Sequence, residues 1–414
     1  MDVAAKLLIA IIITLIFYTY VGYPMLLMVL GIFSRRKKQL EDEELPSVAL
    51  IVSVHNEERV IREKIENILK IDYPPDLLRV IVASDGSIDD TDAIVREYEG
   101  KGNIVLKTFE RREGKSATLN KAVLGIEEDI LIFSDANAFY REDAVRKLVR
   151  NFNDEEVGCV VGRLVYMDSD SYVGQGESLY WKYEGLLNRL ESRLKSVLVA
   201  TGTLFAIRRS MFRPVMKDVA NDFQTPAEVA SQGGGIVYEG EAIAWERTSY
   251  FLTEEFGRKK RIIIRGLTGF NHLKNCFGGR FRKFQFYSRK MLRWWVGAML
   301  PVMYTANVFL LDEPVFYTFF LLQNAFYIFA IIGAILRRGR IRSRVFFIPF
   351  YFVMVNAAAL AAIMMYSSGG RLSSWEKVET TRDMEDHHLE VPRLRVIEGK
   401  KKGSRRAEKI NKIT

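Results

Sequence analysis

Residues 129–140 read D-I-L-I-F-S-D-A-N-A-F-Y, and this stretch indicates the fold class of the chain. Its apolar run, at residues 130–133, has the length and composition of a strand buried on both faces of a sheet. The run ends abruptly at Asp135 and Asn137. These two residues would therefore lie at the carboxyl end of the strand, where open α/β sheets bind ligands.

Asp135 and Asn137 have the chemistry of a cation site. Side chains two positions apart on an extended segment point the same way, so their oxygens could converge on one hard cation and, through it, on a diphosphate. Asp and Asn are also common in solvated turns at strand ends, and taken alone the tripeptide fits such a turn more often. The assignment therefore depends on the rest of the chain.

Three more apolar runs precede this stretch, at residues 48–54, 80–83 and 104–106. Helical patterns with one apolar face lie after the first and the third run. Four strands separated by helices predict a βαβ series and hence a largely parallel sheet. The polar clusters that follow the strands would then lie at the same sheet edge as Asp135.

Beyond residue 140 the alternation of strands and helices becomes less regular. The pattern predicts a long amphipathic helix at about residues 176–196 and a short helix after Asn221-Asp222-Phe223. Together with the first four strands, these elements predict one α/β domain at residues 39–279, with further strands at residues 157–161, 203–207 and 236–238.

The N-terminal segment is predicted to be a membrane anchor. Residues 7–33 are almost uninterruptedly apolar, which is longer than the core of a signal peptide, and no small-residue cleavage pattern follows. Residues 35–38 are all basic and are predicted to face the cytoplasm. We therefore assign residues 1–38 to a retained anchor.

Three further apolar segments predict transmembrane helices within residues 294–366. The arginine-rich loop at residues 337–344 indicates a cytoplasmic side, which agrees with the first anchor. The last segment would export the tail at residues 367–414, although this tail is basic. Either one segment is re-entrant or the tail is exported, so the sequence predicts a multi-pass protein of the cell membrane with a cytoplasmic catalytic domain.

Residues 280–293 are predicted to form an interfacial amphipathic helix, because they mix basic residues with aromatics. We expect the aromatics to rest among lipid headgroups and Arg282, Lys283 and Arg289 to meet lipid phosphates. The net charge of +9 over 414 residues is concentrated near such membrane-flanking segments. Membrane lipids are therefore expected partners and nucleic acid is not, since no nucleic-acid-binding motif is present.

The two cysteines, Cys159 and Cys276, lie far apart in the sequence. This spacing indicates neither a disulfide framework nor a structural zinc site. It is the cysteine usage expected in a reducing compartment.

Six short motifs follow one another in order at the predicted strand and helix ends: V-S-V-H-N-E-E, S-D-G-S-I-D-D-T, E-G-K-S-A-T-L-N, S-D-A-N, A-N-D-F and E-F-G-R-K-K-R. Over roughly residues 46–300 this order resembles the family 2 glycosyltransferases of the GT-A fold. The resemblance is greatest to the membrane-embedded branch of cellulose, hyaluronan and poly-N-acetylglucosamine synthases. It implies an inverting, metal-dependent hexosyl- or N-acetylhexosaminyltransferase that uses a UDP-sugar.

The resemblance also implies roles for the residues of the donor site. Lys115 would lie near the diphosphate as a point charge. Asp135 and Asn137 match the Asp-x-Asp of the family and would bind Mg²⁺ or Mn²⁺, with Asn in place of the second Asp. The uracil and ribose would be held by four residues that follow the first two strands, namely His55, Asn56, Glu57 and Asp85.

Asp222 matches the acidic residue that acts as general base in the family. An inverting transfer needs a base opposite the leaving nucleoside diphosphate, and one carboxylate suffices. Alone, an Asp at a helix start is more often a capping residue, but the ordered motif series favours the base. Thr201 and Gly202 resemble the segment beside the acceptor, and Trp245-Glu246 resembles a stretch that backs the site.

The chain departs from the processive synthases in lacking Gln-x-x-Arg-Trp. In its place Arg258 and Arg261 lie three apart on one helical face, where they could offset diphosphate charge or simply form a basic face beside lipid. The missing Trp leaves open whether synthesis is processive. The acceptor is therefore a polysaccharide or a lipid-linked sugar, and an oligomeric channel is a further possibility.

A nonenzymatic membrane sensor of nucleotide sugars is the alternative function. A sensor has no need of the base Asp222, so the presence of Asp85, Asp135 and Asp222 together favours the enzyme. A small-solute transporter is disfavoured, because a long soluble α/β pattern separates the first apolar segment from the others.

Overall fold

The structure, a computed structural model, describes residues 2–34, 44–167, 172–247, 252–274, 277–336 and 343–370, without the side chains of residues 172–179. All the described residues belong to one compact unit. The basic flank at residues 35–38, most of the arginine-rich loop, Cys276 and the tail beyond residue 370 lie outside this description.

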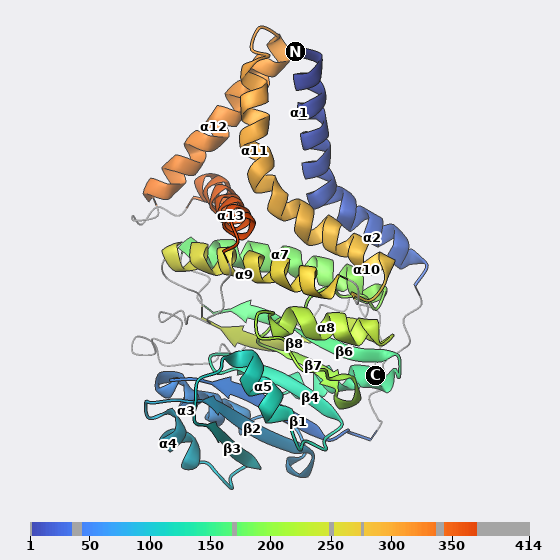
Figure 1. Cartoon of the computed structure of the whole chain (residues 1–414), viewed down its shortest axis with the longest axis vertical. Coiled ribbons are helices and arrows are strands. Elements are labelled where there is room, and N and C mark those ends of the chain that lie inside the picture. The colour runs from blue at the N-terminus through green and yellow to red at the C-terminus, as the bar shows by residue number, and fades with distance from the viewer. Residues whose placement is uncertain are drawn as a thin grey trace, which may run out of the picture. The chain divides into compact units, whose positions relative to one another are not determined.

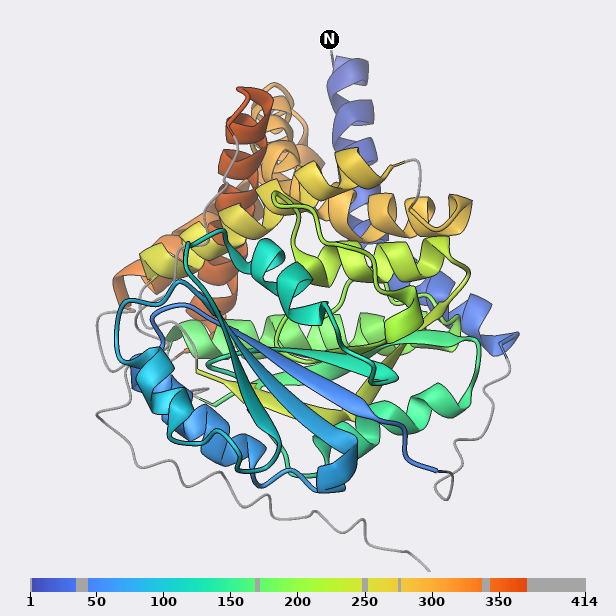
Figure 2. The ribbon, with the colours of Figure 1, turned by 60° about the horizontal axis from the view of Figure 1, so that its bottom comes forward.

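The described residues form an eight-stranded sheet in the order β3-β2-β1-β4-β7-β6-β8-β5. Its first half is parallel and consists of β1 (Val48–Val54), β2 (Leu78–Asp85), β3 (Ile104–Phe109) and β4 (Ile130–Asp135). Figure 2 shows these blue to teal strands fanning out with a twist. The predicted α/β fold with a parallel βαβ series is therefore confirmed.

The second half of the sheet is mixed in direction. Strand β7 (Phe205–Arg208) runs antiparallel to β4 and to β6 (Val157–Tyr166), and β5 (Phe139–Tyr140) runs antiparallel to β8 (Gly235–Glu246). Strands β6 and β8 are parallel to each other. Both are much longer than predicted, because they pair along their whole length across two register shifts.

Helices cover the sheet and leave an aliphatic core between the layers. Buried side chains of β1, β4 and β7 form this core with α5, and Ile51, Leu131 and Ile207 are fully inaccessible. Cys159 lies in the same core as a free thiol. The covering helices are α3 (Glu58–Ile68), α4 (Thr91–Arg96), α5 (Lys115–Val123), α6 (Ala144–Val149) and α8 (Asn221–Ser231), with 3₁₀ turns at Pro75–Leu77, Arg150–Asn153 and Arg209–Met211.

Two long helices, α7 (Tyr172–Arg193) and α9 (Leu252–Leu273), lie between the sheet and the apolar helices (Figure 1). Helix α7 packs on β6 and β8, whereas α9 packs on α8 and on an apolar helix, α13. The apolar part consists of α1 (Asp2–Phe17), the π-helix η1 (Tyr18–Gly22), α2 (Tyr23–Ile32), α10 (Arg280–Phe286), the π-helix η5 (Tyr287–Met291), α11 (Leu292–Val308), α12 (Pro314–Leu336) and α13 (Arg344–Ser367).

Within the described residues, three helices are long and apolar enough to cross a membrane: Asp2–Ile32, Pro314–Leu336 and Arg344–Ser367. The segment predicted at residues 294–311 forms α11, which packs along α1 but is not among these three. Helix α13 is the most enclosed of the three, with 44% of its apolar window buried against 17% in each of the others. The reason is that α9, α11 and α12 all pack against it.

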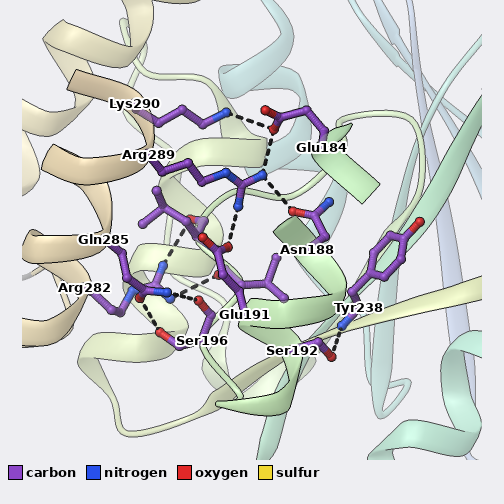
Figure 3. A network of polar contacts seen from close by, with 12 residues as sticks. Glu184, Asn188, Glu191, Ser192, Ser196, Tyr238, Arg282, Gln285, Arg289 and Lys290 are labelled. Carbon is purple, nitrogen blue, oxygen red and sulfur yellow. Dashed lines mark hydrogen bonds and ion pairs between the residues drawn. The ribbon is translucent and has the colours of Figure 1, made fainter. Parts of the chain in front are cut away.

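The expectation that the basic residues of segment 280–293 face lipid phosphates is wrong for Arg282 and Arg289, which are both buried. Arg289 forms ion pairs with Glu184 and Glu191 of α7, and Arg282 donates to the carbonyls of Val197 and Leu198 (Figure 3). A buried cation needs a partner, and α7 supplies carboxylates at the matching positions. The exposed side chains of this segment are Arg280 at its start and the aromatic residues Phe281, Phe284 and Tyr287.

The same network ties the first apolar helix to α7. Tyr23 of α2 donates its hydroxyl to Glu191 at 2.7 Å. Lys290 and Arg293 both pair with Glu184, at 3.3 and 2.6 Å. Burial alone would raise the pKa of Glu184, but these cations and Arg289 more than offset it and hold that pKa well below its ordinary value. The carboxylate is therefore ionised at neutral pH and fixes α7 against η5.

Candidate active site

A cavity of about 550 Å³ opens at the carboxyl end of β4 and is enclosed by α7, α9, η5 and α13. One wall carries the carboxylates of Asp135 and Asp222, and another carries apolar and aromatic side chains of α13, such as Phe352. Tyr20 of the N-terminal helix also lines it. Of the residues predicted from sequence, the cavity brings together Lys115, Asp135, Thr201, Gly202, Asp222, Arg258 and Arg261.

Asp135 and Lys115 are paired at the mouth of the parallel half of the sheet. Asp135 ends β4, and Lys115 begins α5 after Gly114, whose φ of 94° turns the chain in a conformation that suits glycine. The Lys115 ammonium donates to Asp135 Oδ1. A positive charge thus already lies against the oxygen that was predicted to bind a cation.

Asn137 lies beside Asp135 but its side chain is buried. Its Nδ2 donates to Glu246 Oε1 at 2.9 Å, and Glu246 lines the cavity at the end of β8. This contact gives a physical reason for Asn in place of the second Asp of the family motif, because a carboxylate at position 137 would face the carboxylate of Glu246. The hydrogen bond also fixes which way the Asn137 carbonyl oxygen points.

The residues present fit a hard divalent cation. Asp135 and Asn137 offer oxygen donors of the kind that Mg²⁺ and Mn²⁺ take. Within the described residues no group of three or more His, Cys, Asp or Glu side chains is arranged to hold a metal. Two protein oxygens need further ligands, so the site fits an ion that completes its shell with diphosphate and water.

The loops after β1 and β2 interlock. The His55 ring contacts the Asp85 carbonyl through Nδ1 at 2.9 Å, and the Asn56 side chain accepts from the backbone N–H of Ile88 at 2.8 Å. The Glu57 backbone N–H donates to Thr91 Oγ1 at 2.7 Å. The residues predicted to hold the nucleoside do not line the cavity, and His55, Glu57 and Asp85 are buried.

Asp85 has a contact that sequence analysis did not predict. Its two carboxylate oxygens accept the backbone N–H groups of Glu113 and Gly114, each at 2.8 Å. The carboxylate therefore shapes the loop that presents Lys115. Hydrogen bonds to backbone N–H groups cannot be read from a sequence pattern. Only the general preference of Asp for such loops can be read from it.

Asp222 lies in the first turn of α8, but it is not the capping residue. The N-cap is Ala220, and it makes no side-chain capping bond. The Asp222 carbonyl instead accepts the N–H of Ala200 at 2.8 Å, which draws the loop at residues 200–203 against the helix start. The Asp222 side chain is thereby left to line the cavity.

The carboxylates of Asp222 and Asp135 face one small space beside Gly202. A Cβ added to Gly202 would lie 3.5 Å from Asp222 Oδ2 and 3.9 Å from Asp135 Oδ2. Burial raises the pKa of Asp222, while the charges of Lys115 and Arg265 act in the opposite direction. The site thus combines one carboxylate paired with a lysine and a second whose proton affinity is raised.

Helix α9 supplies the basic wall. Arg258 donates to Glu255 Oε2 at 2.9 Å and to the Tyr166 hydroxyl at 2.8 Å, so part of its role is to hold α9 against β6. Arg265, which sequence analysis missed, lines the same cavity and donates to the Val219 carbonyl at 3.2 Å. Its helical spacing of seven from Arg258 was the signal that could have identified it.

Comparisons with known proteins agree with this geometry. The model of Glycosyl transferase family 2 matches residues 49–215. A probable glycosyltransferase, YdaM, from Bacillus subtilis (strain 168) is 31% identical over 222 residues, which cover 50% of this chain and 51% of that protein. The poly-beta-1,6-N-acetyl-D-glucosamine synthase of Staphylococcus epidermidis is 20% identical over the same shares of the two chains.

A beta-monoglucosyldiacylglycerol synthase of Nostoc sp. (strain PCC 7120 / SAG 25.82 / UTEX 2576) is 30% identical over 32% of this chain and 29% of that protein. The aligned region spans about half the length, or less, of these curated relatives. Among solved structures, the mannosyltransferase PcManGT from Pyrobaculum calidifontis, in complex with GDP-Man and Mn²⁺, has a TM-score of 0.65 and 22% identity, with 86% of this chain and 98% of that chain covered. This likeness shows that the fold is the GT-A fold.

Gly202→Ala tests whether the space between the two carboxylates is used. The added methyl makes only ordinary contacts, so we expect thermal stability close to that of the wild type. It would fill the space in which an acceptor must approach, and we expect sugar transfer to fall at least tenfold in a radiolabel assay on membranes. Gly185→Ala is the matched control and should keep full activity, because Gly185 lies on α7 outside the cavity and its added methyl would come no nearer than 3.6 Å to the Tyr238 hydroxyl.

Because Asn137 contacts Glu246, we expect a change toward the Asp-x-Asp motif of the family to weaken binding. Asn137→Asp places two carboxylates together, and we expect Mn²⁺-dependent UDP binding to weaken about tenfold, equivalent to about 1.4 kcal/mol. Adding Glu246→Gln should restore binding, because its amide can donate to the new carboxylate. Titration calorimetry measures nucleotide binding by both variants. Unchanged binding by Asn137→Asp would show that the contact with Glu246 does not account for Asn at position 137.

Proposed function

Residues 49–215 belong to glycosyltransferase family 2, and on this premise we propose that the chain transfers a sugar, with inversion, from a nucleotide-sugar donor to an acceptor hydroxyl. The observation that supports this most is the pair of carboxylates facing one space at Gly202, with Asp135 beside Lys115 and Asp222 opposite. Asp135 together with Lys115 is suited to binding a diphosphate, and Asp222 is suited to accepting a proton.

On the donor side, Asp135 and Asn137 would hold Mg²⁺ or Mn²⁺, and Lys115 would turn from Asp135 toward the diphosphate. The bound cation would neutralise charge on the leaving nucleoside diphosphate. We propose UDP as the nucleotide, held by the loops of His55, Asn56, Glu57 and Asp85. PcManGT, which shares the fold, was solved with GDP-Man and Mn²⁺. Binding of UDP should therefore be compared with binding of GDP.

On the acceptor side, Asp222 would accept the proton of the attacking hydroxyl as the new glycosidic bond forms. Its raised pKa makes it a stronger base than an exposed Asp, and the charges of Lys115 and Arg265 limit that rise. Thr201 and Gly202 would position the hydroxyl. A sensor of nucleotide sugars has no need of a general base, so we favour the enzyme over the sensor.

The acceptor would arrive from the membrane side of the cavity. Tyr20 and the aromatic residues of α13 form that side, and they belong to two of the helices apolar enough to cross a membrane. We therefore favour a lipid-linked sugar or a lipid alcohol as the acceptor, with the catalytic part on the cytoplasmic face. A growing polysaccharide is the second candidate, which the similarity to a poly-N-acetylglucosamine synthase favours.

The direct test incubates membranes with radiolabelled nucleotide sugars, one at a time, and separates lipid-soluble from polymeric product. We expect one donor to label the lipid fraction. Asp222→Asn should lower transfer by about 10²- to 10⁴-fold while leaving UDP binding nearly unchanged, because a base acts in the transition state. Asp76→Asn, an exposed carboxylate outside the cavity, is the control. Near-normal turnover in Asp222→Asn would remove Asp222 from the mechanism.

The pH profile gives an independent test of the same residue. Because the pKa of Asp222 is raised, the base becomes protonated as the pH falls through a value above that of an ordinary Asp, and transfer is lost there. Arg265→Met removes a positive charge that lowers this pKa, so the acid limb of log kcat/KM should move to higher pH. An acid limb that stays in place in Arg265→Met would contradict the assignment.

A further inference from the structure

Lys64 is a fully buried lysine behind the cation-binding turn, and no step proposed so far uses it. It belongs to α3 and is 0% exposed. Its ammonium donates to Ser134 Oγ at 2.8 Å and to the carbonyl of Ala138. It also lies 4.0 Å from the centroid of the Tyr140 ring, within the range of a cation–π contact.

A fully buried ammonium group costs free energy, because it loses its hydration. Burial lowers the pKa of Lys64 to about 7, although the charge of Asp135 acts in the opposite direction. The neighbouring inward positions of α3, Ile61, Ile65 and Ile68, are apolar and buried, as in an ordinary amphipathic helix. An apolar side chain at position 64 would fill the same space without desolvating an ammonium, so packing alone does not account for the lysine.

The two hydrogen-bond acceptors of Lys64 flank the cation ligands. Ser134 directly precedes Asp135, and Ala138 directly follows Asn137. One ammonium therefore spans the turn from both ends and limits how far its two ligand residues can move apart. Glu246 fixes the Asn137 side chain from another direction.

The third contact of Lys64 leads to the acceptor side. Tyr140, on whose ring the ammonium lies, donates its hydroxyl to the Thr203 carbonyl at 2.9 Å. Thr203 directly follows Thr201 and Gly202, the residues beside Asp222. The cation-binding turn and the acceptor loop are thus held by one pair of stacked side chains.

We propose that Lys64 is a positioning residue that sets the geometry of the turn at residues 134–138 and, through Tyr140, of the acceptor loop at residues 201–203. The proposal rests on the proposed function, since it takes this turn as the donor and cation site. Its role is distinct from that of Lys115, which lies inside the cavity.

The test uses the full-length protein in detergent or nanodiscs and three variants. Lys64→Met removes the donors and the charge at similar size. Tyr140→Phe keeps the ring but removes the hydroxyl, which donates to the Thr203 carbonyl at 2.9 Å and to the Phe133 carbonyl at 3.5 Å. Lys107→Met is the matched control, because Lys107 also donates to two backbone carbonyls, those of Ala122 and Leu124 at 2.9 and 3.0 Å, and none of these three residues lines the cavity.

Each protein is titrated with UDP and with GDP, in Mn²⁺ and in EDTA, and its melting temperature is recorded. We expect Lys64→Met to fold, to bind nucleotide at least tenfold more weakly in Mn²⁺, and to change little in EDTA. Tyr140→Phe should bind nucleotide like the wild type but show a lower ratio of transfer to donor hydrolysis. Lys107→Met should match the wild type in both.

Two results would overturn the proposal. One is Mn²⁺-dependent binding in Lys64→Met equal to that of the wild type, and the other is an equal loss in Lys107→Met. If Lys64→Met does not fold, Ser134→Ala, which removes one of the two acceptors of Lys64, is judged by the same criteria. A wild-type protein that binds neither nucleotide would contradict the proposed function itself, which separates the two failures.

Discussion

The pairing of β4 with β7 is the constraint on which the site depends. On its other edge β4 pairs in parallel with β1, as a βαβ unit requires, but β7 runs the opposite way, with Phe133 aligned to Phe205. The two rings stack with centroids 5.1 Å apart and are almost fully buried. Because the strands are antiparallel, the loop that enters β7 lies where β4 ends. Thr201 and Gly202 therefore lie beside Asp135 in the cavity wall.

The charged residues of the cavity are held in place partly by charged residues that do not line it. Lys64 and Asp85 hold the loops that present Asp135 and Lys115, and Glu246 holds Asn137. Beside the apolar helices, the cluster of Glu184, Glu191 and Arg289 does the same for η5 and α7. Buried ionic groups are costly unless every partner is in place, so these contacts restrict the loops to few arrangements.

Two of the helices that are apolar enough to cross a membrane also contribute to the cavity wall. Helix α13 is the most enclosed of the candidate spanning helices because α9 and α12 pack along it, and its aromatic side chains complete the wall opposite Asp135. Seen in Figure 1, α9 lies directly between this helix and the sheet. A ligand in the cavity would therefore contact polar groups at one end and apolar groups at the other.

The sequence by itself determined the parallel strands, the apolar helices and the charged residues Asp135, Asp222 and Lys115 of the cavity wall, because strand ends and helical periodicity are local patterns. It could not indicate that Arg282 and Arg289 point inward, since a basic, aromatic helix looks the same whether lipid phosphates or the carboxylates of α7 neutralise it. It also passed over Lys64, which resembles any lysine on a helix. Only the tertiary structure decided these points, because burial and charge pairing depend on which distant elements pack together.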